Sequence, residues 1–269
     1  MNCFVRAMRW LFECNISLVS KQQRTEGQFN MAYYMVLDTE TCDTYARKTD
    51  QPEPWNSLVY DIGFTVVDSK TFEQMASGSF VVAETFNNSR LMNSSYYADK
   101  LPAYREGISL DNSGDWQMLS FIEIYQHIKD IIKKYNVKKV WAYNCKFDNA
   151  ALNSTIRTYS NGFVNYFFPY GVKVCDIWDY ASCITATKGY LEFVSEHGLF
   201  SDKGNPKTNA EAVYAYITAN PSYIERHTAY EDALIECEIL KAAKKKHTKK
   251  RNTVGQGWRD CSNLYHSLK

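Results

Sequence analysis

The chain has 269 residues, 45% of them hydrophobic, and a formal net charge of +1 at neutral pH. This length is enough for one sizeable domain with attached segments. A net charge so close to zero excludes a polycation that coats nucleic acid through its overall charge, and no stretch approaches the roughly 18 apolar residues of a membrane-spanning helix. Any attraction to an anionic partner must therefore come from local patches.

The eight cysteines are scattered along the chain, and no two of them form a Cys-x-x-Cys pair. Neither a zinc ribbon nor a thioredoxin-like redox motif is therefore indicated. Residues 1–30 contain an apolar stretch that Arg6 and Arg9 interrupt, with no small-residue cleavage site after it. We expect this segment to be an N-terminal extension, disordered or dispensable, with Met31 as an alternative start. We also expect a cytoplasmic protein with reduced thiols.

Three strands are predicted first. Residues 32–37 are apolar and aromatic, residues 58–67 form a second apolar run, and residues 78–82 alternate between apolar and small or polar side chains. Gly63, within the second run, indicates a bulge or a close contact with another element. Three successive strands of this kind favour an antiparallel meander.

Helices and strands alternate in the rest of the chain. Residues 84–115 are polar and aromatic, which indicates short helices and a loop that shapes a substrate groove. Apolar residues at helical spacing predict a helix over 119–136. The other predicted elements are strands over 137–143 and 172–175, helices over 144–157, 176–186 and 210–219, a loop over 198–209, and a long helix from residue 228 to 246. The order of elements favours a mixed α/β sheet, with a C-terminal tail over 251–269 that lacks clear periodicity.

An acidic pair, Asp38 and Glu40, directly follows the first predicted strand. Acids at strand ends are common, so the pair by itself has an ordinary explanation. If the strand continues past Leu37, the two side chains point to the same face, because side chains alternate along a strand. Two like charges on one face repel each other unless a cation neutralises them. The pair therefore indicates a metal site if matching acids arrive from elsewhere in the chain.

Two further acids are candidates for that site. Asp148 comes just after the strand predicted over 137–143, where it could equally be the N-cap of the next helix. Asp232 lies inside the long helix beside its apolar face, and an acid there needs a partner because burial of an uncompensated charge is costly. His227 precedes Asp232 by five residues, at a helix start where a histidine is more often a cap or a surface residue.

Three segments in this order, LDTET, AYNCKFDNAALN and HTAYEDALIE, resemble the motifs of the DnaQ-like 3′–5′ exonucleases, the DEDD superfamily on a ribonuclease H-like fold. His227 and Asp232 match the branch in which four residues separate these two side chains (DEDDh), and residue 228 is Thr where the other branch has Tyr. The segments SSYYADKLPAY and KGNPKTNAEAVYAYI further resemble exonucleases of bacteriophage type. The resemblance implies an α/β, ribonuclease H-like mixed sheet of three antiparallel strands plus parallel strands, flanked by helices, in an exonuclease domain over 31–250.

The resemblance also implies a chemistry. Asp38, Glu40, Asp148 and Asp232 would bind two Mg²⁺ ions, with Mn²⁺ as a substitute, since hard oxygen ligands favour these cations. Asp38 would bridge the two ions, and Asp148 would act partly through water. His227 would be the general base that deprotonates the attacking water. The expected reaction is hydrolysis of phosphodiester bonds at the 3′ ends of single-stranded DNA or RNA, with release of nucleoside 5′-monophosphates.

Several residues are candidates for substrate contacts. Thr39 would offer its backbone N–H and side chain to the terminal nucleotide, as in the family. Phe147 would stack on a base, although a place in the core is the stronger interpretation, and the same holds for Leu58 and Ile62 as the lining of a base pocket. The basic run over 244–251 would contact phosphates, or simply favour a helix C-terminus.

Two other functions are compatible with the sequence. The chain could be a nucleic-acid-binding module that has kept the fold without catalysis, or an accessory proofreading subunit that binds a separate polymerase. The presence of all four acids and of His227 favours the enzyme. No membrane partner is expected.

Overall fold

The computed structural model contains two compact units, Met1–Met31 and Ala32–Lys269. It describes residues 32–43, 56–93, 95, 98–109, 116–246 and 257–268, all in the second unit. The predicted N-terminal extension, 1–30, lies outside the described residues. Within these ranges, none of the helices has the length and apolarity needed to span a membrane.

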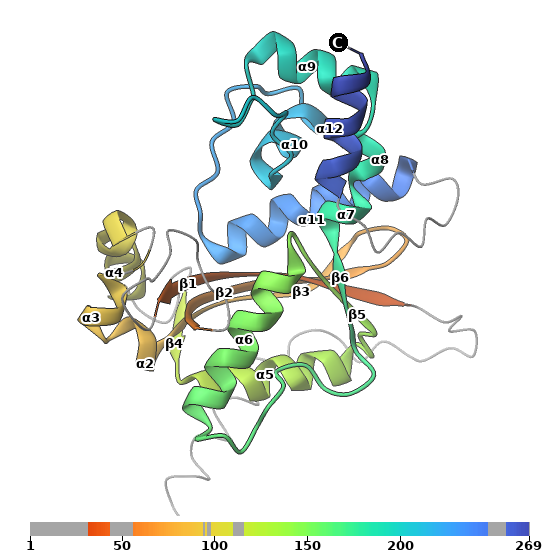
Figure 1. Ribbon diagram of the computed structural model, residues 1–269. Coiled ribbons are helices and arrows are strands. Elements are labelled where there is room, and N and C mark those ends of the chain that lie inside the picture. The colour runs from red at the N-terminus through yellow and green to blue at the C-terminus, as the bar shows by residue number, and fades with distance from the viewer. Residues whose placement is uncertain are drawn as a thin grey trace, which may run out of the picture. The chain divides into compact units, whose positions relative to one another are not determined.

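A six-stranded mixed sheet forms the centre of the second unit, with the strand order β4-β3-β2-β1-β5-β6 (Figure 1). β1, β2 and β3 are antiparallel, as predicted, whereas β4 runs parallel to β3, β5 parallel to β1 and β6 parallel to β5. The strands are β1 (Tyr33–Asp43), β2 (Ser57–Asp68), β3 (Gln74–Val82), β4 (Gln117–Leu119), β5 (Lys139–Ala142) and β6 (Lys173–Asp176). β4 was not predicted, because its three residues are too few to show a period.

β1 is longer than the sequence predicts. The apolar run stops at Leu37, but the polar residues after it continue to pair with β2, with Asp38 opposite Gly63 and Glu40 opposite Asp61. The register shifts only after Glu40. The two acids therefore stand within a strand, not at its end, and their side chains share one face of the sheet.

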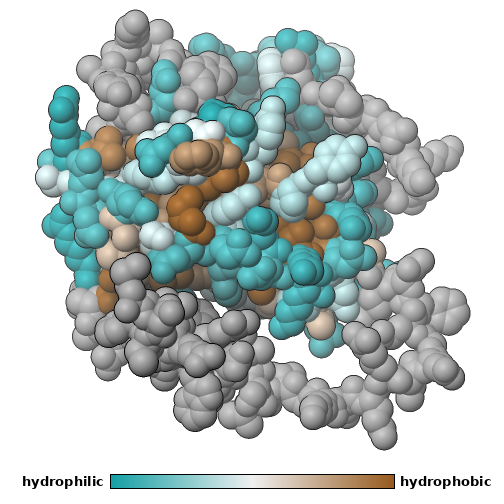
Figure 2. All heavy atoms as spheres, turned by 90° about the horizontal axis from the view of Figure 1, so that it is seen from below, coloured by the Kyte–Doolittle hydropathy of each residue, from teal (hydrophilic) through white to brown (hydrophobic). Residues whose placement is uncertain are grey.

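Two helices cover one face of the sheet, α5 (Phe121–Lys134) and α6 (Cys145–Tyr159) (Figure 1). α5 begins at a capping box in which Ser120 and Glu123 satisfy each other's backbone N–H groups. Its apolar residues point into a core with the sheet, and its charged residues point outward. The surface on this side is accordingly mostly hydrophilic, with smaller hydrophobic areas between (Figure 2).

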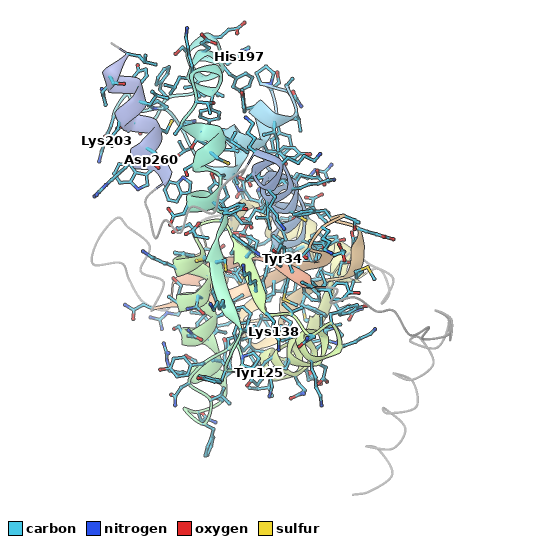
Figure 3. All side chains as sticks on the ribbon, turned by 90° about the vertical axis from the view of Figure 1, so that its right-hand side faces the viewer. Tyr34, Tyr125, Lys138, His197, Lys203 and Asp260 are labelled. Atoms are coloured by element: carbon cyan, nitrogen blue, oxygen red, sulfur yellow. The ribbon has the colours of Figure 1, made fainter. Side chains whose placement is uncertain are left out.

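The other face carries a larger helical layer built on α11 (Ala229–Lys246) (Figure 1). The remaining helices of this layer are α7 (Ile177–Tyr180), α8 (Ser182–Thr185), α9 (Lys188–His197), α10 (Ala210–Ile217) and α12 (Gly257–Ser267). In Figure 3, Tyr34 lies in the sheet, Tyr125 with the lower helices, and His197 and Asp260 in this upper layer. The layer encloses a second apolar core against the sheet.

Three of these helices differ from the sequence prediction. The helix predicted over 176–186 is divided into α7 and α8 at Ala181, and α9 was not predicted. α12 lies in the segment predicted to be a tail without periodicity, yet it contacts α7 and α8 and buries Cys261 completely. Cys261, Leu264 and Tyr265 form the packed face of this helix, a signal too sparse to stand out in the sequence.

The polar segment predicted over 84–115 is largely helical. It contains α2 (Ala83–Phe86), α3 (Ser89–Met92), the 3₁₀ helix η1 (Ala98–Lys100) and α4 (Leu101–Ser109). Leu101 and Tyr104 are buried in a third apolar core together with Leu58 and Tyr60 of β2. The predicted short helices are confirmed, and they are packed against the sheet.

β2 and α11 approach each other unusually closely. A Cβ atom on Gly63 would stand 2.1 Å from the backbone nitrogen of Tyr230, in the first turn of α11. The sequence left a bulge or a close contact open at Gly63, and the structure has the close contact. Only glycine fits here, because the obstructing atoms belong to the backbone.

Gly63→Ala is expected to lower the free energy of unfolding by about 1–3 kcal/mol, because the added methyl group forces α11 away from β2. Urea unfolding followed by circular dichroism measures this change. Gly189→Ala in α9 is the matched control: its nearest neighbour is the Tyr216 hydroxyl at 3.2 Å, and alanine is a better helix former than glycine. Equal stability of wild type and Gly63→Ala would contradict the close contact.

Candidate active site

Asp38 and Glu40 face α11 from the middle of β1. Glu40 is 9% exposed and Asp38 is half-buried. Burial raises the pKa of Asp38 well above its usual range, and the charges of Glu236, Asp148 and Asp232 raise it further. Burial also raises the pKa of Glu40 well above its usual range, with Asp232 as the next cause. Both carboxylates are therefore held where a negative charge is unfavourable.

Asp148 lies in the first turn of α6 and is 5% exposed. The N-cap of this helix is Asn144, in a left-handed conformation, so the interpretation of Asp148 as an N-cap is wrong. The Thr39 hydroxyl donates a 2.8 Å hydrogen bond to Asp148 Oδ1 and so joins α6 to β1. Burial raises the pKa of Asp148 to about 7, although the bond from Thr39 opposes this shift.

Asp232 lies on the first turns of α11 and is 6% exposed. Among the described residues, its Oδ1 atom has no hydrogen-bond partner. Burial raises the pKa of Asp232 to about 8, the charges of Glu225 and Asp61 raise it further, and Lys100 opposes them. An unsatisfied buried carboxylate oxygen is costly, so the site is suited to a ligand that this oxygen can bind.

His227 stands just before α11 with its backbone in the left-handed region, at φ 55°. Its Nδ1 atom lies 3.7 Å from Glu225 Oε2. Burial lowers the pKa of His227, and the charge of Lys100 adds to this effect. One ligand atom each of Glu40, His227 and Asp232 lie within 4.8 Å of one another, which is close enough to share a cation.

Several contacts hold the segment that carries His227. Arg226 forms an ion pair with Glu231 at 2.8 Å, and the Thr228 hydroxyl donates to the same carboxylate at 2.9 Å. The Lys100 ammonium donates to the backbone carbonyl of Arg226. The left-handed conformation at a non-glycine residue is strained, and these neighbours stabilise it.

Three residues near the acids were not singled out from the sequence. Asp61 is completely buried, and its Oδ2 atom accepts hydrogen bonds from the Tyr104 hydroxyl at 2.6 Å and from the backbone of Ala229 at 3.0 Å. Glu236 follows Asp232 by one helical turn and is 3% exposed. Lys100 comes from η1. Only the spacing of Asp232 and Glu236 on the buried face of one helix could have been recognised beforehand.

The predicted substrate contacts lie close to the acids. Thr39 is 7% exposed, with its hydroxyl directed to Asp148, and Phe147 is half-buried beside that acid in α6. Leu58 and Ile62 are core residues, as the stronger interpretation held. Lys244 donates hydrogen bonds to the Ser69 carbonyl at 2.6 Å and to the Tyr34 hydroxyl at 3.2 Å. These bonds give Lys244 a structural role that needs no phosphate contact. Residues 247–251 of the basic run lie outside the described residues.

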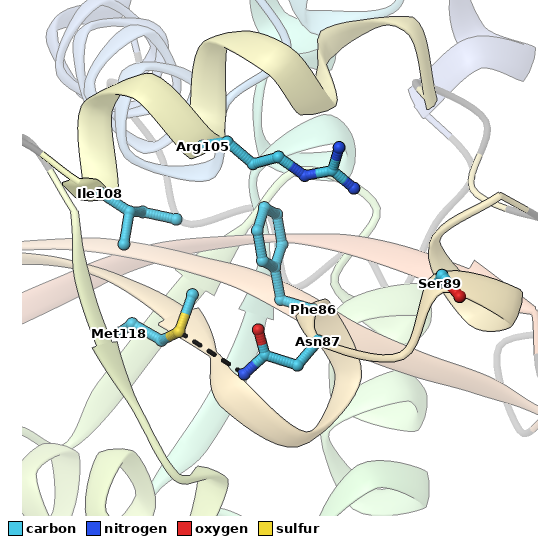
Figure 4. A pocket seen from close by; sticks show the side chains of 6 residues that line it. All are labelled: Phe86, Asn87, Ser89, Arg105, Ile108 and Met118. Carbon is cyan, nitrogen blue, oxygen red and sulfur yellow. Dashed lines mark hydrogen bonds between the residues drawn. The ribbon is translucent and has the colours of Figure 1, made fainter.

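A pocket of about 340 Å³ lies apart from these acids, between α2, α4 and β4 (Figure 4). In Figure 4 the Arg105 side chain extends over the ring of Phe86, and Asn87 Nδ2 donates to Met118 Sδ at 3.8 Å. The lining residues are Phe86, Asn87, Ser89, Arg105, Ile108 and Met118. The pocket contains none of the predicted site residues.

The donor set suits a hard divalent cation. Four buried or half-buried carboxylates converge from β1, α6 and α11, and repulsion and burial disfavour all of their charges. Oxygen donors of this kind are the ligands of Mg²⁺ and Mn²⁺ in proteins. The buried Asp232 Oδ1 atom has no hydrogen-bond partner among the described residues, and it could therefore be a ligand of such an ion.

No protein-family model and no curated protein sequence matches the chain. Solved structures do resemble it. The nuclease domain of 3′hExo, a DEDDh family member bound to rAMP, superposes with a TM-score of 0.51 at 13% identity, over 82% of this chain and 96% of that one. The fold is that of the DEDDh 3′ exonucleases. The predicted ribonuclease H-like mixed sheet flanked by helices is thereby confirmed.

Exonuclease I has the same fold. E. coli Exonuclease I in complex with a 5cy-dT13 oligonucleotide superposes with a TM-score of 0.52 at 13% identity, over 88% of this chain and 44% of that one. The apo form of Exonuclease I gives a TM-score of 0.51 at 16% identity, over 88% and 46% of the two chains. The chain thus spans less than half the length of Exonuclease I.

The raised pKa values predict how stability depends on pH. In the folded protein the pKa values of Asp148 and Asp232 are about 7 and about 8, above the value near 3.9 of an unfolded aspartate. Between these values the folded state binds more protons than the unfolded state. Without divalent cations, the free energy of unfolding is therefore expected to fall as the pH rises from about 5 to about 8.

A divalent cation is expected to reverse this trend, because it binds the deprotonated carboxylates. The rise in thermal unfolding midpoint on adding MnCl₂ should be larger at about pH 8 than at about pH 5.5. Thermal unfolding in EDTA and in MnCl₂ at both pH values measures it, with NaCl at equal ionic strength as the control. A cation effect that does not grow with pH would contradict the assignment.

Proposed function

We propose that the protein is a metal-dependent 3′–5′ exonuclease that acts on the 3′ ends of single-stranded DNA or RNA and releases nucleoside 5′-monophosphates. The observation that carries this proposal is the convergence of five side chains from distant segments of the chain onto one partly buried site: Asp38, Glu40, Asp148, Asp232 and His227. This convergence occurs on a fold shared with 3′ exonucleases.

Asp38, Glu40, Asp148 and Asp232 would hold two Mg²⁺ ions, or Mn²⁺ in their place. When bound, such ions activate a water nucleophile and neutralise the charge that develops on the scissile phosphate. Thr39 fixes the orientation of Asp148 through the hydrogen bond from its hydroxyl. The hydrogen bonds of Asp61 to Tyr104 and Ala229 fix the first turn of α11, and with it Asp232.

His227 would be the general base. Its lowered pKa keeps the imidazole neutral near pH 7, so that it can accept a proton from water. Nδ1 faces Glu225, and we assign the incoming proton to Nε2. The contacts of Arg226 and Thr228 with Glu231 support this role, because an ordered segment around His227 would reduce the ordering that catalysis otherwise requires.

The proposed substrate is a single-stranded nucleic acid end. E. coli Exonuclease I was solved with a dT13 oligonucleotide, and the 3′hExo nuclease domain with rAMP. Thr39 and Phe147 are the predicted contacts of the terminal nucleotide, next in sequence to Asp38 and Asp148. We therefore propose both single-stranded DNA and single-stranded RNA as substrates, and the assay below compares their rates.

Stepwise shortening of 5′-labelled single-stranded oligonucleotides in Mg²⁺ is expected, with loss of about a thousandfold or more in Asp148→Asn. Gel electrophoresis of DNA and RNA substrates, with EDTA as the metal-free condition, measures the products. Asp130→Asn, an exposed acid on α5, is the matched control and should leave the rate unchanged. Wild-type protein that binds the oligonucleotides without shortening them would instead indicate a binding module.

His227→Ala is expected to lower kcat by about a hundredfold to ten-thousandfold, because the water loses its general base. The affinity for the oligonucleotide should change little, since the carboxylates remain. Rate measurements under single-turnover conditions and fluorescence anisotropy separate the two quantities. A His227→Ala variant with the wild-type rate would exclude the imidazole from the proton transfer.

A further inference from the structure

Three aromatic side chains project from the loop that joins α6 to β6, residues 160–172, which we call the aromatic loop. Phe163 is 90% exposed, Tyr166 is 73% exposed and Tyr170 is 108% exposed. They are three of the eight large hydrophobic side chains that are exposed among the described residues. Rings gathered so closely on a surface typically mark a place where another molecule binds.

Other residues of the aromatic loop fix its backbone. The N–H of Phe167 donates a 2.8 Å hydrogen bond to Asn153 Oδ1 of α6. Phe167 is 1% exposed in the core between the sheet and α5 and α6, and Val164, Phe168 and Val172 pack against the same core. The loop thus holds one set of side chains inward and the three exposed rings outward, so a ligand would not have to order it on binding.

The part of the chain that surrounds this loop is basic. Residues 121–175, which contain α5, β5, α6 and the loop, include eight Lys and Arg but three Asp and Glu, whereas the whole chain has a net charge of +1. The sequence has no acid between Asp148 and Asp176. Such a local excess of positive charge attracts an anionic partner even though the protein as a whole is nearly neutral.

Two of these cationic side chains adjoin the loop directly. Arg157, near the end of α6, donates from Nη1 to the backbone carbonyl of Asn165 at 3.4 Å. Lys129 Nζ lies 4.8 Å from the centre of the Tyr125 ring. That ring packs against Phe167 of the loop, with 5.6 Å between the ring centres. Positive charge therefore stands beside the exposed rings.

Two further lysines stand where the loop enters the sheet. Lys138 directly precedes β5, Lys173 is the first residue of β6, and both are exposed. The backbone N–H of Lys173 donates to the carbonyl of Lys138 at 2.9 Å. In Figure 3, Lys138 and Tyr125 both lie below Tyr34 of the sheet. Rings for bases together with cations for phosphates are the combination that binds single-stranded nucleic acid, whereas a protein partner would need the rings alone.

α6 connects the aromatic loop to the acids of the proposed site (Figure 1). Asp148 lies in the first turn of this helix, and the loop begins after its last residue, Tyr159. At 1.5 Å per residue, the two ends are about 17 Å apart along the helix. A strand whose 3′ end lies at the acids therefore reaches the loop within a few nucleotides.

We propose that the aromatic loop is a second contact for single-stranded nucleic acid, in which bases stack on Phe163, Tyr166 and Tyr170 and phosphates meet the surrounding cations. This inference rests on the proposed function for the identity of the strand. Stacking tolerates any sequence because every base has an aromatic face, so the loop binds DNA and RNA alike. It retains a long strand while the 3′ end is shortened.

Binding of an oligo-dT strand of about 20 nucleotides, followed by fluorescence anisotropy in EDTA, tests the loop without catalysis. Replacing all three exposed rings with alanine is expected to weaken binding about a hundredfold, because three stacked bases lose their partners. The matched control keeps the rings: Phe163→Tyr, Tyr166→Phe and Tyr170→Phe together should bind as tightly as the wild type. Trp258→Ala, at an exposed aromatic residue of α12, should also leave the affinity unchanged.

Two further variants make the test independent of the triple substitution. If the triple alanine variant does not fold, as judged by circular dichroism, Tyr170→Ala alone removes a completely exposed ring and should weaken binding about fivefold. Lys173→Gln should reduce the slope of log affinity against log salt concentration by about 0.7, because one phosphate contact is lost. Lys188→Gln, at an exposed lysine of α9 that pairs with Glu192, is its matched control and should not change the slope.

Wild-type affinity in the folded alanine variants would overturn the inference and indicate a protein partner for the loop. A ring-keeping variant that binds as weakly as the alanine variant, or an unchanged salt slope in Lys173→Gln, would overturn it as well. These outcomes are separate from the proposed function. In an active exonuclease the triple alanine variant should raise KM for the long strand and leave kcat near the wild-type value, because the acids and His227 are untouched. Shortening with an unchanged KM would reject the inference alone, and binding through the loop without shortening would reject the exonuclease alone.

Discussion

The contact between β2 and the first turn of α11 determines the rest of this site. Gly63 lets the two backbones touch, and the carboxylate of Asp61, two residues earlier, accepts the N–H of Ala229. An N–H in the first turn of a helix has no partner within the helix, and a negative charge is favourable at that end. Once this turn is fixed, Asp232 and Glu236 are directed at β1, because both lie on the face of α11 that meets the sheet.

The same carboxylate joins a third element to the site. The Tyr104 hydroxyl of α4 donates to Asp61, and Tyr104 is buried against Tyr60 of β2. Burial raises the pKa of Asp61 to about 6, and the hydrogen bonds from Tyr104 and from the backbone of Ala229 oppose this rise. Lys100, four residues before Tyr104, is thereby held beside His227. The polar segment between β3 and β4 thus contributes a packed wall and a charged side chain to the site.

The carboxylates of the site repel one another and are poorly solvated. Burial raises the pKa values of Asp38, Glu40, Asp148 and Asp232, so each charge is unfavourable where it stands. The two apolar cores on the opposite faces of the sheet supply the free energy that keeps these acids together. Together these acids destabilise the folded state without cations. The cations that the proposed reaction needs would therefore also stabilise the folded protein.

Local patterns in the sequence were enough to predict the first three strands and the long helices, and to single out the four acids and His227 as candidates, since period, turn residues and motif spacing are local properties of the chain. It did not determine the length of β1, because the polar residues from Asp38 onward continue the ladder only where β2 offers them partners. It also missed α12, whose few apolar residues become a helix face only against α7 and α8. The contacts of Asp61, Lys100 and Glu236 follow from the tertiary structure. Whether an acid is buried, and which charge stands beside it, depends on segments 43 to 168 residues apart that meet only when the chain has folded.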